Sequence, residues 1–125
     1  MLTPWDIVLV LILLQTKHLI MDWLWQPEYE WRNKGTLGHW GGIRHSVKHA
    51  LGTGACFLMF VPVWSVLAAM LLDFVVHYAV DWCKMNINRV QGWGPLTHAQ
   101  FWWLTGADQY AHQITYVLLI IMMML

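Results

Sequence analysis

Histidine and aspartate recur four residues apart in this sequence. The five pairs are His18 with Asp22, His45 with His49, Asp73 with His77, His77 with Asp81, and Asp108 with His112. Seven histidines and five aspartates scattered over 125 residues would give about one such pair by chance. A spacing of four places both side chains on one face of an α-helix, one turn apart. The pattern therefore predicts helices whose inner faces carry imidazoles and carboxylates.

Such groups on facing helices are typical ligands of zinc, iron or manganese. The predicted metal ligands are His18, Asp22, His49, His77, Asp81, Asp108 and His112. They outnumber the four ligands of a tetrahedral zinc, so we expect either two ions or some residues that only orient the ligands. Zinc is the first choice, with iron and manganese as alternatives. Residues within a turn of the ligands are expected to hydrogen-bond to them: Gln26, Lys84, Gln109 and Thr115.

The same residues allow simpler interpretations. Any single pair is more often a hydrogen bond between helices than a ligand set. Asp108 alone could favour a helix N-terminus, and Lys17, Lys48 and Lys84 could pair with the carboxylates and leave none for a metal. The coincidence of pairs in four segments favours a metal site, with a hydrogen-bond or proton network as the alternative.

The composition indicates a membrane protein. Hydrophobic residues make up 58% of the chain, charged residues only 11%, and the mean hydropathy is +0.47, outside the usual soluble range. The formal net charge of zero provides no broad basic face, which argues against nucleic-acid binding. The first apolar run lacks a basic start and a small-residue cleavage pattern, so we expect a retained helix rather than a signal peptide.

Four transmembrane helices are expected in one domain covering residues 1–125. Thr3 is the predicted N-cap of the first, with Pro4 and Asp6 in its first turn. Pro62 divides a long apolar stretch, with Ser65 as the next N-cap. The predicted spans are about 4–26, 42–61, 65–84 and 107–125. A capping box of Thr97 and Gln100 predicts a short interfacial helix before the last span, giving an all-α, up-down four-helix bundle.

The distribution of charge predicts the orientation. All seven lysines and arginines lie in or beside the connections 27–41 and 85–106, whereas the two termini and the turn at 62–64 have none. Basic connections stay in the cytoplasm, so both termini are expected on the opposite side of a bacterial inner membrane. The four His/Asp pairs would then share one level near the cytoplasmic interface, with Asp73 about two turns deeper. Cys56 and Cys83 would lie at different depths, as free thiols.

Four segments resemble one known family. They are HLIMDWLWQ (18–26), RHSVKHAL (44–51), HYAVDWCK (77–84) and ADQYAHQIT (107–115). In this order they resemble the small bacterial and phage membrane family called domain of unknown function 3307. The resemblance covers nearly the whole chain and implies a polytopic membrane protein of no established activity. A more distant similarity to membrane-bound metal-dependent hydrolases implies an enzyme, by analogy of fold and ligand type.

Three functions follow as hypotheses. The first is a metal-dependent hydrolase of an amphiphilic substrate, with Asp73 or His45 as general base. The second is an ion or proton relay through the same residues, although the outer halves of the helices offer almost nothing polar to continue it. The third is a phage membrane effector without enzymatic activity, acting as a homo-oligomer or through a host membrane protein.

Overall fold

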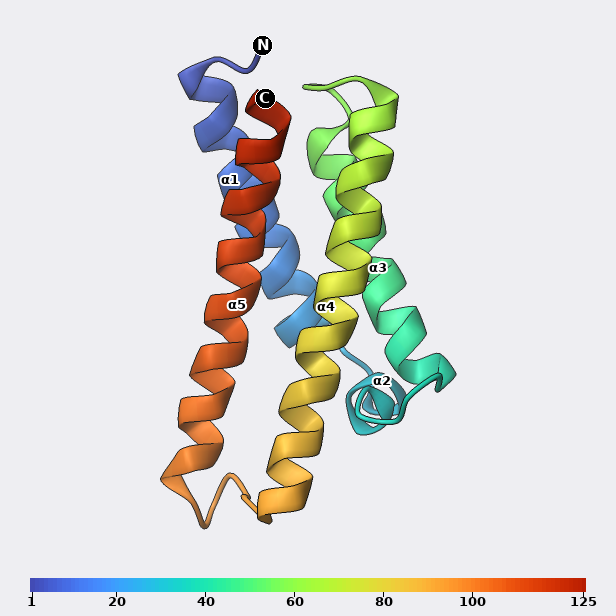
Figure 1. Ribbon diagram of the computed structural model, residues 1–125, viewed down its shortest axis with the longest axis vertical. Coiled ribbons are helices and arrows are strands. Elements are labelled where there is room, and N and C mark those ends of the chain that lie inside the picture. Colours follow the sequence, from blue (N-terminus) through green and yellow to red (C-terminus); the bar gives the residue numbers. More distant parts are fainter.

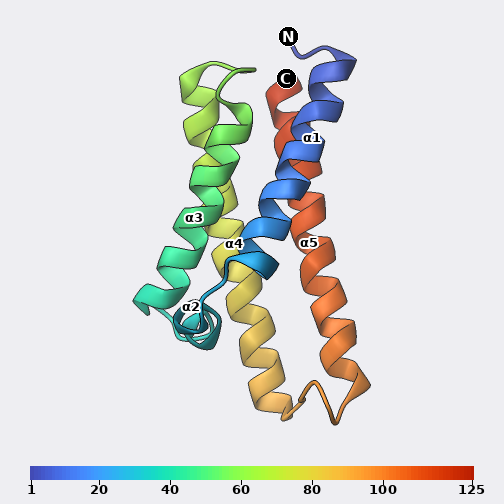
Figure 2. The ribbon, with the colours of Figure 1, turned by 180° about the vertical axis from the view of Figure 1, so that it is seen from behind.

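The computed structural model describes all 125 residues and is entirely helical. Its elements are α1 (Pro4–Leu19), η1 (Ile20–Leu24), α2 (Glu28–Asn33), α3 (Trp40–Phe57), α4 (Val63–Gln91) and α5 (Ala99–Met124). The four long helices alternate in direction (Figures 1 and 2). The two termini and the α3–α4 turn lie at one end, and α2 and the α4–α5 connection lie toward the other.

The predicted start of the first helix is confirmed. Thr3 is the N-cap, Pro4 is the first helical residue, and the Asp6 carboxylate accepts the Thr3 backbone N–H at 2.8 Å. The Thr3 hydroxyl accepts the Asp6 N–H at 3.2 Å, which completes a capping box. Pro27 follows the helix, as expected, and its fixed φ of −59° starts α2.

The last turn of the first helix is wider than predicted. Residues Ile20–Leu24 form a π-helical turn, which the N–H of Trp25 closes on the carbonyl of Ile20 at 2.6 Å. Such a turn contains an extra residue relative to an α-helical turn, and so changes the direction of the side chains it carries. Asp22 lies within it, and its Oδ2 remains 3.3 Å from His18 Nε2, as the four-residue spacing predicted.

The expected division of the long apolar stretch is confirmed, with shifted boundaries. Pro62 separates α3 from α4, but α3 ends at Phe57 and α4 begins at Val63. The prediction of Ser65 as the N-cap of this helix was wrong. Pro62 is the N-cap of α4, and Ser65 already lies within the helix. At the other end of α3, His39 is the N-cap and its Nδ1 accepts the N–H of Gly41 at 3.0 Å.

The predictions for residues 85–106 were wrong. Helix α4 runs on to Gln91 and stops at Gly92, whose φ of 67° favours glycine. Asparagine is tolerated at position 86 inside the helix because its side-chain amide has hydrogen-bond partners. It donates to the Gly35 carbonyl at 2.9 Å and to the Trp82 carbonyl. The separate interfacial helix does not exist, since α5 is continuous from Ala99, and its N-cap is His98 rather than a Thr97–Gln100 box.

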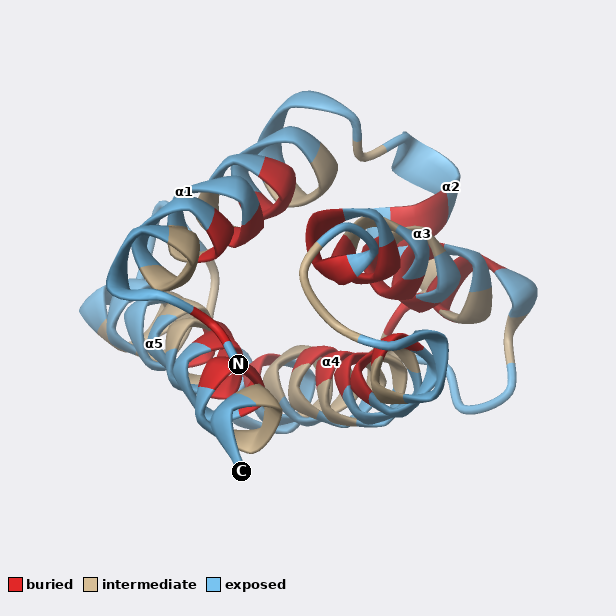
Figure 3. Cartoon of the chain, turned by 90° about the horizontal axis from the view of Figure 1, so that it is seen from above, coloured by how far each residue is buried: buried red, intermediate tan, exposed pale blue.

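The interior has an apolar half and a polar half. Toward the termini, a buried core joins residues of α1, α3, α4 and α5: Val10, Leu14, Cys56, Phe57, Val66, Ala69, Tyr116, Leu119 and Ile120. Beyond it, the buried side chains are mainly His, Asp, Lys and Glu. Viewed along the helices, the buried residues face the common centre (Figure 3).

Two segments are long and apolar enough to cross a membrane, by length and composition alone. They are Pro4–Leu24 and Val63–Gln91. Only 22% of the apolar window in each is buried inside the protein, so most of this apolar surface faces outward. The cysteines are free, Cys56 buried and Cys83 exposed.

Candidate metal centre

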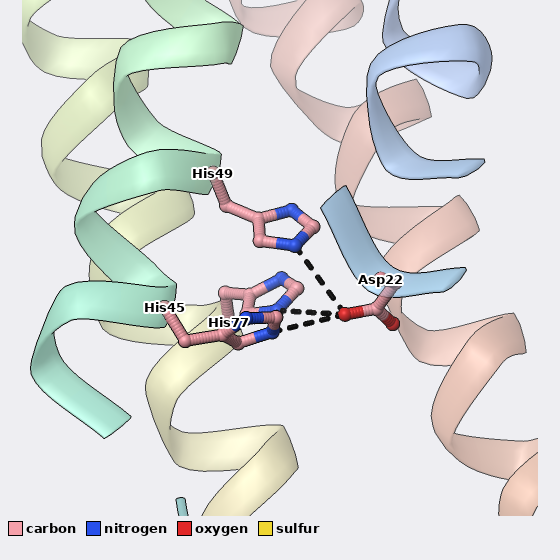
Figure 4. A group of neighbouring side chains, drawn as sticks. All are labelled: Asp22, His45, His49 and His77. Atoms are coloured by element: carbon pink, nitrogen blue, oxygen red, sulfur yellow. Dashed lines mark hydrogen bonds and ion pairs between the residues drawn. The ribbon is translucent and has the colours of Figure 1, made fainter. Parts of the chain in front are cut away.

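The histidines and aspartates of all four long helices meet in one buried layer. Two groups of side chains could hold a metal ion, with ligand atoms within 4.8 Å of one another. The first group is Asp22, His45, His49 and His77, and the second is His77, Asp81 and His112. Figure 4 shows the imidazoles of the first group turned toward one oxygen of Asp22. His77 belongs to both groups, so the layer is continuous.

Four ligand-type atoms in this layer lie close to one another. His45 Nε2 lies 2.9 Å from Asp22 Oδ1, 3.1 Å from His77 Nε2 and 3.3 Å from Asp81 Oδ2. His77 Nε2 lies 3.7 Å from Asp22 Oδ1 and 3.4 Å from Asp81 Oδ2. Ligands about 2.0–2.1 Å from a tetrahedral ion are separated by about 3.3–3.4 Å. The five separations bracket this value, so two imidazoles and two carboxylates are near enough to one another to approach a shared cation.

The tautomer of His45 suits a ligand. Its Nδ1 lies 3.3 Å from Glu30 Oε2, and a carboxylate can only accept, so Nδ1 carries the proton. Its Nε2 lies 2.9 Å from Asp22 Oδ1, so this nitrogen also carries a proton unless an ion takes the place of that proton. This convergence requires a cation or a proton between the groups. A carboxylate behind a metal-bound histidine is also a common way to fix its orientation.

His18 is occupied by other partners. The Tyr116 hydroxyl lies 2.8 Å from its Nδ1, and Gln109 Oε1 lies 2.8 Å from its Nε2. The Lys17 ammonium donates to the Tyr116 oxygen at 3.1 Å, so Tyr116 donates its own proton to Nδ1, and Nε2–H donates to Gln109. Both ring nitrogens of His18 are therefore used in hydrogen bonds.

His49 is in a similar position. Its Nδ1 lies 3.3 Å from the Lys17 ammonium, which can only donate. The proton of the neutral ring is then on Nε2, which lies 3.3 Å from Asp22 Oδ1. This contact places His49 beside Asp22 and suits it for orienting the carboxylate, without forming a hydrogen bond.

Gln109 links two carboxylates of the layer. Its Nε2 donates to Asp22 Oδ2 at 3.1 Å and to Asp108 Oδ2 at 3.0 Å. Of the other residues expected beside the ligands, Gln26 donates to Asp22 Oδ1 at 3.3 Å, and Lys84 lies 3.5 Å from Asp108 Oδ2. Thr115 instead donates to the Ala111 carbonyl of its own helix.

Several buried ligand-type atoms have no hydrogen-bond partner. They include His49 Nε2, His112 Nε2, Asp108 Oδ1 and both carboxylate oxygens of Asp81. Asp81 and Asp108 do lie near charged groups, since Asp81 Oδ1 and Asp108 Oδ1 are each 3.5 Å from His112 Nε2. Unpaired buried acceptors are costly, and a bound cation would satisfy them. The donor set of the layer thus fits a divalent ion.

The two predicted general bases lie in different places. The His45 side chain is fully buried, and its Nε2 is one of the four close ligand-type atoms. Asp73 lies beside the apolar core, where Lys17 donates to its Oδ2 at 3.0 Å and the Thr53 hydroxyl donates at 2.6 Å. Asp73 is thus engaged with Lys17 and Thr53 and is absent from both metal-type groups.

The sequence analysis missed two residues from the connection between η1 and α3. Glu30 is only 1% exposed. Its carboxylate accepts a hydrogen bond from Arg44 Nε at 2.9 Å and lies 2.6 Å from Lys48 Nζ. Burial raises the pKa of Glu30, but the hydrogen bonds from Lys48 and Arg44 prevail, so the pKa is below its ordinary value. No spacing rule pointed to Glu30, because it belongs to a short helix that was expected to be a loop.

Lys34 is the second missed residue. Its ammonium lies 3.2 Å from Asp81 Oδ2. Burial lowers the pKa of Lys34, but attraction to Asp81, Asp22 and Asp108 outweighs this effect and raises it above the ordinary value. Lys34 is therefore a permanent cation at the edge of the layer.

A cavity of about 480 Å³ adjoins the layer on the side of the α4–α5 connection. Asp22, Gln109 and Lys34 form part of its lining, with Lys84 and Asn88 of α4. Its lining residues come mainly from η1, α2, α4, the α4–α5 connection and α5. Figure 1 shows that α4 and α5 continue past the end of the first helix. A molecule in this cavity would lie beside the carboxylate of Asp22.

Comparison with known proteins identifies a family but no activity. No curated protein and no solved structure matches the chain. A family model matches residues 8–125, nearly the whole length, and includes all four segments that carried the resemblance. The chain thus belongs to the family described as "Protein of unknown function (DUF3307)".

Proposed function

We propose that this protein crosses a bacterial inner membrane with its four long helices and is a metal-dependent hydrolase of an amphiphilic substrate. The observation that carries the proposal is the convergence of Asp22, His45, His77 and Asp81, with five separations between 2.9 and 3.7 Å. Zinc is the ion that best suits this nitrogen and oxygen set, with iron or manganese as alternatives. His112 and Asp108 extend the set and would hold a second ion if one binds.

The surrounding residues have supporting roles in this proposal. Glu30 orients His45, while Gln109 and His49 orient Asp22. A bound divalent ion would lower the pKa of a water molecule and polarise the bond to be broken. The substrate would approach through the cavity beside Asp22. With Asp73 engaged by Lys17, a carboxylate of the layer is better placed to take the proton of the water.

A proton relay is the second candidate. Lys17, Tyr116, His18 and Gln109 form a chain of hydrogen bonds that ends on Asp22. The charges of the layer also balance without a metal. The number of carboxylates (Asp22, Glu30, Asp73, Asp81 and Asp108) equals the number of cations (Lys17, Lys34, Arg44, Lys48 and Lys84). Four of the carboxylates pair with these cations, whereas Asp22 lies beside histidines. Beyond Lys17, however, the chain meets the apolar core, which argues against a continuous path.

Metal analysis of detergent-purified protein tests the proposal. The wild type is expected to contain about one or two equivalents of zinc, iron or manganese. His77→Ala should lose the metal because His77 belongs to both groups, and Asp81→Ala should lose at least part of it. His98→Ala is the matched control, since His98 lies outside the layer and contacts only Thr97 and Gly94. A folded, metal-free wild type would contradict the hydrolase and favour the proton relay.

A further inference from the structure

Aromatic side chains line much of the cavity, and residues of the polar layer line the rest. Trp23, Trp31, Trp93 and Phe101 line it, and Asp22 is on the side of the metal-type groups. Trp23 and Trp31 are 57% and 44% exposed, so the cavity is accessible from outside the protein. Its volume of about 480 Å³ is within the range of small-molecule sites, about 300–1,000 Å³. The shape and lining suit a molecule with a polar head and an apolar portion.

The charges that line the cavity favour an anion. Three cations, Lys34, Lys84 and Arg89, line it with one carboxylate, Asp22. Lys34 and Lys84 lie near Asp81 and Asp108, respectively. The Arg89 side chain is exposed and donates only to the neutral Asn86, so its guanidinium retains donors for a ligand.

A metal would increase this preference. The layer is balanced at five carboxylates and five cations, so a divalent ion adds two positive charges next to the cavity. An anionic group in the cavity would offset them. Asn88, which is 8% exposed and lines the cavity, has a side-chain oxygen without a hydrogen-bond partner. This oxygen can accept a hydrogen bond from a hydroxyl or ammonium group of a headgroup, but not from an ionised phosphate.

We infer that the cavity binds a phosphate-bearing amphiphile, with the phosphate near Arg89 and Lys84 and the apolar portion against Trp23, Trp31 and Phe101. This inference rests on the proposed function and names the class of its substrate. Arg pairs with phosphate through two parallel hydrogen bonds, and the aromatic rings provide the apolar contact. The phosphate could belong to a membrane lipid or to a free anion, and the test separates the two.

Tryptophan fluorescence of the metal-loaded protein in neutral maltoside micelles measures the binding. The probes are dioctanoyl phosphatidic acid, dioctanoylglycerol and inorganic phosphate. We expect the phosphatidic acid to bind at least about tenfold more tightly than either of the others, because only it has both the charge and the apolar chains. Equal affinity for dioctanoylglycerol would overturn the role of the anion, and equal affinity for inorganic phosphate would overturn the amphiphile.

Two variants locate the site. Arg89→Gln should weaken binding of the phosphatidic acid about five- to tenfold. Arg32→Gln is the matched control, because Arg32 is exposed, pairs with Glu28 and does not line the cavity. Phe101→Ala should weaken binding of the phosphatidic acid but not of inorganic phosphate. An unchanged affinity in Arg89→Gln would place the anion elsewhere and overturn the inference.

The metal content of the same samples keeps the two proposals apart. Metal-containing protein that does not prefer the anionic lipid overturns the inference and leaves the metal centre intact. Protein that lacks metal but still binds the phosphatidic acid selectively, with the Arg89 dependence, supports the cavity assignment and contradicts the hydrolase.

Discussion

Asp22 uses its two oxygens for different purposes. Oδ1 faces His45, His49 and His77, while Oδ2 accepts the Gln109 amide. The side chain is only 4% exposed, so a solvent-facing alternative is not open to it. A buried carboxylate is stable only when its charge is balanced and its lone pairs are used. Asp22 is therefore the residue through which the ligands and their hydrogen-bond partners meet.

Asp73 is predicted to stabilise the fold rather than hold metal. Asp73→Asn removes the charge that faces Lys17 and leaves a buried ammonium, which costs about 3–5 kcal/mol for fully buried pairs. The Tm in detergent should fall, while the metal content should stay at the wild-type value. The double variant Lys17→Met with Asp73→Asn should lose less than the sum of the single variants. Strict additivity in this double-mutant cycle would show that the pair does not interact.

Glu30 should make the stability dependent on pH. Its pKa is lowered on folding, so its contribution is fully present above the unfolded value of about 4.5 and is lost as the pH falls through the folded value. Glu30→Gln should therefore reduce the Tm at pH 7, equivalent to about 1–3 kcal/mol, and the difference from wild type should shrink toward pH 4.

Glu28→Gln is the control for Glu30, since Glu28 pairs only with Arg32 on the surface. It should change the Tm little at any pH. A wild-type advantage over Glu30→Gln that stays constant from pH 7 to pH 4 would contradict the role assigned to the Glu30 charge.

Two short elements, one π-helical and one α-helical, bring residues into the layer. The π-helical turn η1 carries Asp22, and the short helix α2 carries Glu30 to the side of α3, where it faces Arg44 and His45. The close packing of α2 on α3 depends on Gly41. A Cβ added there would lie 2.6 Å from the Tyr29 carbonyl oxygen and 2.9 Å from Asn33 Cβ. No side chain fits without moving the backbone of α2.

A pair of glycine variants tests this packing. Gly41→Ala should lower the Tm, because the contact is with backbone that cannot move aside. Gly106→Ala is the matched change inside α5, where an added Cβ meets nothing within 4 Å. It should stabilise the protein by about 0.5–1 kcal/mol, since alanine is the better helix former. Equal effects of the two substitutions on the Tm would contradict the α2–α3 contact.

The two ends of the molecule differ in the polarity of their buried residues. The termini and the α3–α4 turn adjoin the apolar core, whereas α2, the cavity and most of the basic residues lie toward the opposite end (Figures 1 and 2). Exposed leucine, isoleucine and valine cover the outer faces of the long helices. The proposed multi-pass orientation, with the basic connections in the cytoplasm, predicts an arrangement of this kind.

Single cysteines test the orientation. Met59 in the α3–α4 turn is 91% exposed, and Leu96 in the α4–α5 connection is 96% exposed. In a background with Cys56→Ala and Cys83→Ser, a membrane-impermeant maleimide should label Met59→Cys in spheroplasts and Leu96→Cys in inverted membrane vesicles. The reverse pattern would invert the topology. Labelling of both sites from one side would contradict the four-span arrangement.

The sequence by itself determined the helical class, the start of α1, the break at Pro62 and the histidine and aspartate faces. These features are local: a capping box, a proline and a four-residue period act over a few neighbouring residues. The family was also readable from the four ordered segments, and the family match confirms it. The continuation of α4 was not readable, because Asn86 bonds to the distant Gly35 carbonyl in addition to the Trp82 carbonyl of its own helix.

Only the tertiary structure decided how the layer is divided among its residues. His45, His49 and His18 look alike in the sequence, but Nδ1 of His45 donates to Glu30, whereas Nδ1 of His49 accepts from Lys17 and Nδ1 of His18 accepts from Tyr116. Those partners lie 15, 32 and 98 residues away along the chain. The tautomer of an imidazole depends on the group behind it, and the packing of the helices determines which group that is.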